Sequence, residues 1–162
     1  MNFHEYKDNP LFKQHILTMS RAEFVKEWED VDSWIKKGYV VVSINDTKYE
    51  EMWVKAHRRG GLCDNLFTYI VADVEEDEDG AFTEEQALDI VNITDIFNKS
   101  SFIVHCFIGC SRSVAVAKWI NEYLGLMDEE LEQCEHYNKR VYEMLKEAEK
   151  KYWDKEGEKN NA

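Results

Sequence analysis

The stretch that most constrains this chain runs from Phe102 to Ala117. It opens with an apolar run that is typical of a buried strand, which ends at His105. A short loop carrying Cys106 and Gly109 follows, and a helix of small residues begins near Arg112. A strand that turns through such a loop into a helix points successive backbone N–H groups inward, and with the positive end of the helix dipole they bind a dianion. The stretch therefore predicts a phosphate-binding loop at the end of a buried strand.

Three side chains of this loop suit the hydrolysis of a phosphate ester. The N–H groups and the dipole that hold phosphate oxygens also favour the thiolate form of a cysteine, so Cys106 is a candidate nucleophile. Arg112 offers a planar fork of donors for two equatorial oxygens of a phosphoryl group. Ser113 is placed to hydrogen-bond the sulfur and to stabilise its departure from a phospho-cysteine. A buried cysteine or a surface arginine alone is ordinary, but the whole set indicates catalysis.

The pattern His105-Cys106-x-x-Gly109-x-x-Arg112-Ser113 resembles the signature of the cysteine-based protein tyrosine phosphatases, in particular small bacterial and phage members of the dual-specificity branch. The resemblance implies that His105 orders the loop and helps to set the state of the thiolate. It also implies a reaction without metal or cofactor. The residues that it assigns to phosphate binding are Phe107, Ile108, Gly109, Cys110, Ser111 and Arg112.

The resemblance also implies a general acid on a loop roughly thirty to forty residues before the cysteine. One carboxyl group there protonates the leaving oxygen and later activates water. We assign this role to Asp73, because it directly follows the strand expected at 66–71. The competing acidic residues of the same loop are Glu75, Glu76, Asp77, Glu78 and Asp79. Outside the two loops the resemblance is loose and covers residues 43–142.

Two features depart from the family pattern. Phe107 and Ile108 stand where small or polar residues are usual, and they either shape the rim of the site or pack into the core. Cys110 lies in the same loop as Cys106, and Cys63 is a more distant cysteine. Reversible protection of an oxidised Cys106 by one of them is a hypothesis that mild peroxide treatment would test.

Strand and helix patterns alternate along the chain. We expect strands at 14–18, 39–44, 66–71 and 102–105, and helices after capping boxes at Ser20 and Thr83. Further helices are expected at 47–57 with Met52 inward, at 112–124, from Asp128 to 135 and at 136–152. This order predicts an α/β fold of three layers, with a central four- or five-stranded, mostly parallel sheet flanked by helices. We expect one domain over 1–162, with a mobile arm at 1–10 and a frayed tail at 155–162.

Composition restricts the partners and the compartment. The net charge of −13 over 162 residues disfavours nucleic acid and anionic membranes. Four scattered cysteines fit neither a zinc site nor a disulfide scaffold, and no stretch reads as a signal peptide or membrane span. We expect a cytoplasmic protein without metal.

The pair Arg58-Arg59 either flanks the phosphate pocket or forms a solvated turn. Nothing in the sequence indicates an oligomeric state.

The resemblance implies a phosphatase that acts on phosphotyrosine, phosphoserine or phosphothreonine of a protein or peptide. A phosphatase of RNA 5′ ends or inositol phosphates uses the same loop, but such substrates usually need additional basic residues around the pocket, and Phe107 and Ile108 supply none. A phosphate-binding module without turnover is the alternative from another class. Arsenate reductases and low-molecular-weight phosphatases place the loop near the N-terminus, so the late position of Cys106 argues against them.

Overall fold

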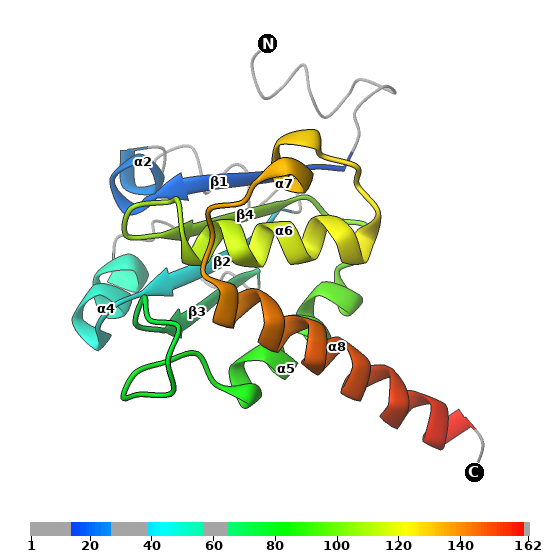
Figure 1. Ribbon diagram of the computed structural model, residues 1–162. Coiled ribbons are helices and arrows are strands. Elements are labelled where there is room, and N and C mark those ends of the chain that lie inside the picture. Colours follow the sequence, from blue (N-terminus) through cyan, green and yellow to red (C-terminus); the bar gives the residue numbers. More distant parts are fainter. Residues whose placement is uncertain (1–13, 27–38, 57–64, 161–162) are drawn as a thin grey trace.

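The computed structural model describes residues 14–26, 39–56 and 65–160. Its described strands form one parallel sheet in the order β1-β4-β2-β3 (Figure 1). The strands are β1 (Ile16–Ser20), β2 (Val40–Asn45), β3 (Leu66–Ile70) and β4 (Phe102–Cys106). The two central strands, β2 and β4, are buried along their whole length because helices cover both faces of the sheet. The predicted α/β architecture is confirmed, with four strands among the described residues.

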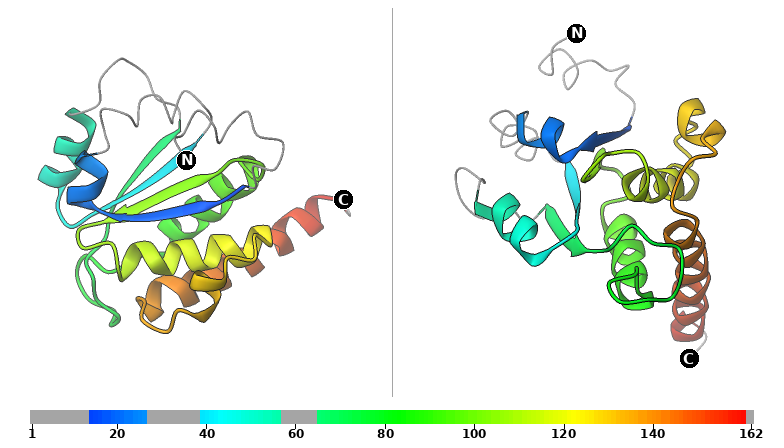
Figure 2. Two further views of the ribbon diagram at one scale, coloured as in Figure 1. Left: turned by 90° about the horizontal axis from the view of Figure 1, so that it is seen from above. Right: turned by 60° about the vertical axis from the view of Figure 1, so that its left-hand side comes forward.

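Helices lie on both faces of this sheet (Figure 2). One face carries α5 (Glu84–Ile96), α6 (Arg112–Leu124), α7 (Glu129–Gln133) and α8 (Lys139–Asn160), and their core cluster includes Trp119 and Leu145. The other face carries α2 (Arg21–Lys26) and α4 (Lys48–Ala56), where Phe24 and Val54 pack on Val41 and Ile103. Alternate residues of each strand point to opposite faces, so each strand contributes to both clusters.

The expected helix ends follow from local hydrogen bonds. Thr83 and Gln86 form a complete capping box at the start of α5, and the Ser20 hydroxyl accepts from the Glu23 N–H at the start of α2. Gly125 ends α6 in the left-handed conformation, with φ of 64°. The carboxyl ends of all four strands meet at one edge of the sheet, which is where parallel sheets place their ligands.

Three expectations on local structure need correction or fall outside the described residues. The expectation of a frayed tail at 155–162 is wrong up to residue 160. Helix α8 continues to that residue through a run of Lys and Glu that includes the ion pair Glu156–Lys159. Met52 is 59% exposed, and Val54 is the residue of α4 that meets the sheet. The arm at 1–10 lies outside the described residues. No helix in the described ranges is long and apolar enough to cross a membrane.

Candidate active site

Cys106 is the last residue of β4, and its side chain is buried at the start of the predicted phosphate loop. Its Sγ lies 3.2 Å from the Ser113 Oγ, and the Gly109 N–H donates to the same sulfur over 3.2 Å. When the sulfur is a thiolate it can accept from both groups. The structure therefore places two donors around the predicted nucleophile, one of them from the loop backbone.

The loop keeps its curvature because Gly109 has no side chain. Its φ is +84°, and a Cβ at this position would lie 2.5 Å from the backbone carbon of Met19 and from the backbone nitrogen of Ser20. The loop therefore rests directly on the end of β1. The Arg21 N–H donates a backbone hydrogen bond of 3.1 Å to the Phe107 carbonyl, which fastens the start of the loop to α2.

The N-terminus of α6 is left open toward the loop. Ser111 occupies the N-cap position but makes no side-chain hydrogen bond to the helix. Its hydroxyl instead donates to the Asp73 carboxylate over 2.8 Å. The first-turn N–H groups of this 13-residue helix consequently have no side-chain cap, which is the arrangement that anion-binding helix ends share.

Arg112 is held so that only part of its guanidinium is used by the protein. The side chain is 4% exposed, and its Nη1 donates to the Asp46 carboxylate and to the Val71 carbonyl. Its Nε is buried without a hydrogen-bond partner among the described residues and lies 4.0 Å from the Asp73 Oδ1. A buried donor without a partner is costly, and a phosphate oxygen would satisfy it.

Sequence reasoning missed Asp46, although a signal for it exists. This residue directly follows β2, which lies beside β4 in the sheet. Carboxyl ends of neighbouring parallel strands meet, so an acidic residue after β2 comes close to residues that follow β4. Strand order, which the sequence alone does not give, decides that this carboxylate meets Arg112.

Asp73 is the acidic residue that the structure brings to the loop. Its Oδ1 accepts hydrogen bonds from the Ser111 hydroxyl and, over 2.9 Å, from the Asn138 side-chain amide. Its side chain is 39% exposed, so the carboxyl group also reaches solvent. Glu75 and Asp77 turn instead toward α8, where they meet the Lys139 N–H and the Arg140 guanidinium. This placement favours Asp73 over its neighbours, and its role as general acid stays a prediction.

Asn138 is a second residue that sequence reasoning missed. It is buried and precedes α8, where its side-chain oxygen caps the helix by accepting from the Val141 N–H over 3.0 Å. Its amide donates to Asp73 and to the Val74 carbonyl, and its own N–H donates to the Ser111 carbonyl. An asparagine before a helix signals a cap. Only the fold shows that this cap also joins the acid loop to the phosphate loop.

His105 lies in the core behind the loop. Its ring stacks on Phe24 with 4.0 Å between centroids. Burial lowers the pKa of His105 to about 3, and the positive charge of Arg21 also lowers it, whereas the Cys106 backbone raises it. Neither ring nitrogen has a hydrogen-bond partner among the described residues. The ring is therefore neutral near pH 7 and adds no positive charge beside the sulfur. Its predicted contribution to loop order remains a prediction.

Some of the remaining residues singled out in the sequence lie in the described part of the structure, and others lie outside it. Phe107 and Ile108 are 48% and 67% exposed, so they belong to the rim of the loop and not to the core. Cys110 is exposed and unbridged. Cys63, which we considered as a partner of Cys106, and the Arg58-Arg59 pair lie outside the described residues.

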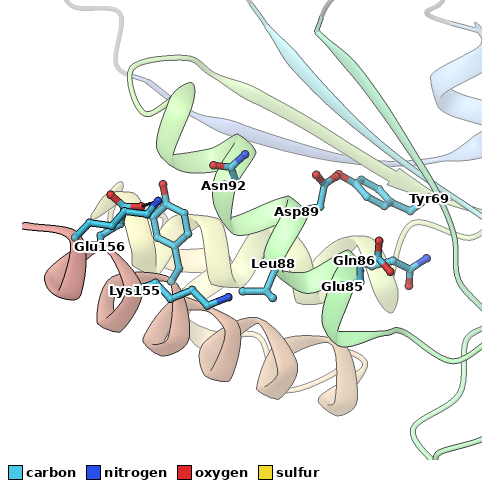
Figure 3. A pocket seen from close by; sticks show the side chains of 10 residues that line it. Tyr69, Glu85, Gln86, Leu88, Asp89, Asn92, Lys155 and Glu156 are labelled. Atoms are coloured by element: carbon cyan, nitrogen blue, oxygen red, sulfur yellow. Dashed lines mark hydrogen bonds and ion pairs between the residues drawn. The ribbon is translucent and has the colours of Figure 1, made fainter. Parts of the chain in front are cut away.

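Two further features bear on ligands. Within the described ranges, no group of three or more His, Cys, Asp or Glu side chains is arranged as a metal site. A separate hollow of about 580 Å³ lies between α5 and the C-terminal half of α8, and Figure 3 shows Asp89 beside Tyr69 on one side and Lys155 on the other. None of its lining residues belongs to the phosphate loop.

The fold is similar to that of Tk-PTP, a protein tyrosine phosphatase, in the crystal structure of its active form. The two chains are 19% identical, and the similarity covers 85% of this chain and 92% of that chain with a TM-score of 0.50. No protein-family model matches the sequence, and no curated protein matches it. The chain therefore has a fold of the protein tyrosine phosphatase type, as the signature predicts.

Proposed function

We propose that this protein is a phosphatase that hydrolyses phosphomonoesters through a phospho-cysteine intermediate. The observation that carries the proposal is the buried Cys106 sulfur between two donors, beside an Arg112 Nε that has no hydrogen-bond partner among the described residues. The proposed substrate is a protein or peptide that carries phosphotyrosine, phosphoserine or phosphothreonine, as in the dual-specificity branch. We place it in the cytoplasm, where cysteines stay reduced.

In the first step, the Cys106 thiolate attacks phosphorus in line with the ester oxygen, and the P–O bond breaks as the P–S bond forms. Asp73 gives its proton to the departing oxygen. Arg112 and the loop N–H groups hold the equatorial oxygens, where charge accumulates. In the second step, Asp73 takes a proton from water, which attacks phosphorus and releases phosphate. The sulfur leaves as a thiolate that the Ser113 hydroxyl stabilises.

The test is the release of phenol from phenyl phosphate by the purified protein and three variants. We expect Cys106→Ser to abolish turnover, and Asp73→Asn to lower kcat by about 100-fold, since general acids contribute at least that much. Asp79→Asn is the matched control, because it removes an exposed carboxylate from the tip of the same loop. Turnover that survives Cys106→Ser would contradict the proposal.

A parallel measurement separates turnover from binding. Inorganic phosphate is expected to raise the Tm of the wild type, since a ligand that binds only the folded state stabilises it. Arg112→Lys is expected to remove the shift, because lysine lacks the donor fork. A phosphate-dependent Tm without hydrolysis of any ester would favour the phosphate-binding module over the phosphatase.

A further inference from the structure

The loop between β4 and α6 is supported from other segments at both of its ends. At its start, the Arg21 N–H donates to the Phe107 carbonyl, and the Arg21 guanidinium lies 5.2 Å from the centre of the Phe107 ring. At its end, the Asp46 carboxylate accepts a hydrogen bond from the Arg112 Nη1. Arg21 begins α2, whereas Asp46 follows β2. The shape of the loop therefore depends on how these two segments are held relative to one another.

Glu50, in the first turn of α4, contacts both of these supports. Its Oε1 accepts from the Arg21 Nη1 over 2.8 Å, and its Oε2 accepts from the Asp46 N–H over 2.7 Å. The Glu50 side chain is only 16% exposed. A surface ion pair contributes little on its own. This one differs from an ordinary pair because the same carboxylate also fixes the residue that meets Arg112.

The hydrogen bond from Asp46 to Glu50 is not part of an ordinary helix cap. The Thr47 hydroxyl already caps α4 by accepting from the Glu50 N–H over 3.2 Å. In a capping box the glutamate side chain would reach back to the Thr47 N–H, but here it accepts from the Asp46 N–H, one residue earlier. The Glu50 carboxylate therefore serves the segment that carries Asp46 more directly than it serves the helix.

Both groups that Glu50 meets are hydrogen-bond donors, and this explains why a carboxylate suits the position. A carboxylate has two acceptor oxygens, one for each donor. A glutamine offers one oxygen, and its NH2 group would face either the Arg21 guanidinium or the Asp46 N–H, donor against donor. Glu50→Gln therefore breaks one of the two contacts while it keeps the length and shape of the side chain.

We propose that Glu50 is a positioning residue of the phosphate site, which acts through Asp46 to fix the direction of the Arg112 guanidinium. The Arg112 Nε, which has no hydrogen-bond partner among the described residues, is then aimed at a phosphate oxygen. This inference rests on the proposed phosphatase function and adds a residue to its machinery. A displacement of about 1 Å in a group that binds the reacting centre costs roughly 100-fold in rate, so a partial release of the guanidinium should cost about tenfold.

The experiment measures kcat and KM with phenyl phosphate, and inhibition by vanadate, for Glu50→Gln and two matched controls. We expect Glu50→Gln to lower kcat about tenfold and to weaken inhibition by a similar factor, because vanadate imitates the phosphoryl group in transfer, which Arg112 binds. Glu51→Gln removes the neighbouring carboxylate, which is also 16% exposed and pairs with Lys55, and should keep the wild-type values. Thr47→Ala removes the cap hydroxyl and should lower Tm while kcat stays unchanged.

A double-mutant cycle tests whether Glu50 acts through Asp46. Asp46→Ala removes the carboxylate that meets Arg112, so adding Glu50→Gln to it should lower kcat by less than about threefold more. Losses that multiply in full would overturn the proposal. A Glu50→Gln variant that loses Tm as Thr47→Ala does, but keeps the wild-type kcat, would overturn it as well.

Failure of the phosphatase function has a different signature. No hydrolysis of phenyl phosphate by the wild type would overturn that function and leave the positioning role to be decided by binding. The measurement is then the rise of Tm with inorganic phosphate. Glu50→Gln should show a smaller rise than the wild type, and Glu51→Gln should show the same rise. An equal rise for all three proteins would overturn the positioning role.

Discussion

Single residues of the loop act through their conformation and their protonation. Gly109 permits a backbone path that no side chain can follow, and His105 fills the core only as a neutral ring. Both residues belong to the signature read from the sequence, yet neither is expected to touch the substrate through its side chain. Their effects should therefore appear in loop integrity and in stability, which distinguishes them from Cys106 and Arg112.

Gly109→Ala is expected to abolish phosphatase activity. The new Cβ would lie 2.5 Å from backbone atoms of Met19 and Ser20, which cannot move aside without breaking the pairing of β1 with β4. Gly125→Ala is the matched control, because Gly125 also has positive φ but has open space around its Cβ position. That variant should lose roughly 1–2 kcal/mol of stability and keep its kcat. Normal activity of Gly109→Ala would contradict the loop geometry.

His105 should make the protein less stable as the pH falls. Its pKa is about 3 in the folded state and about 6.5 when exposed in the unfolded chain, so between these values the unfolded state binds more protons. The free energy of unfolding should therefore decrease by up to about 1.4 kcal/mol per pH unit below pH 6.5 from this group. Denaturant titrations of wild type and His105→Phe, which keeps an aromatic ring against Phe24, measure the difference.

In that comparison the variant should lose less stability than the wild type between pH 7 and 5. His136→Gln, which removes an exposed histidine, should follow the wild type. Parallel curves for wild type and His105→Phe would show that folding does not lower the pKa of His105.

At the scale of elements, the start of α8 joins the two halves of the site. Asn138 donates hydrogen bonds to the Asp73 carboxylate and the Ser111 carbonyl. The Arg140 guanidinium donates to the Phe82 carbonyl and to the Asp77 carboxylate. The acid loop is therefore fastened to the helix. Since α8 also packs on α5 and α6, the position of the carboxyl group depends on helices distant from the chemistry.

Asn138→Ser should separate the cap from the positioning of the acid. Serine is also a good N-cap, so the loss of stability should stay near 1 kcal/mol, but it lacks the amide that donates to Asp73. We expect kcat on a phosphotyrosine peptide to fall about tenfold, with a smaller loss on p-nitrophenyl phosphate, whose leaving group needs less protonation. Thr83→Ala, which removes the α5 cap, should lower Tm and leave kcat unchanged. Equal losses on both substrates would argue against a positioning role.

At the scale of the whole molecule, the proposed phosphate site is embedded in a chain with a net charge of −13. The acidic residues at 73–79 lie on the general-acid side of that site. Long-range repulsion is strong at low ionic strength and is largely screened at physiological salt, where the Debye length is about 8 Å. Charge should therefore select among phosphopeptides by the sign of their flanking residues.

Phosphopeptides with acidic flanks should be hydrolysed faster as salt is raised from about 10 to 150 mM, because screening weakens their repulsion. Peptides with lysine flanks should show the opposite trend in kcat/KM, since screening weakens their attraction. The same series with phenyl phosphate controls for effects of salt on the chemical step. Identical salt dependence for both peptides would show that the net charge does not reach the site.

The sequence by itself determined the class of fold, the strand–loop–helix unit around Cys106 and most of the helix ends. These depend on contacts between near neighbours in the chain: the apolar run before Cys106, the capping box at Thr83 and the glycine after α6. Local patterns of this kind are legible because the interacting residues are adjacent. The length of α8 was underestimated because a charged surface helix has the composition of a solvated tail.

Only the tertiary structure decided which residues from distant segments meet. Asp46, Asp73 and Asn138 are separated by up to 92 positions, yet they lie around the loop that carries Arg112, because strands β2, β3 and β4 end and helix α8 begins on the same side of the sheet. It also decided that Phe107 and Ile108 face solvent, a choice that the sequence left open. Contacts across a sheet depend on the order of the strands and on the placement of the helices. Patterns among neighbouring residues in the chain reveal neither of them.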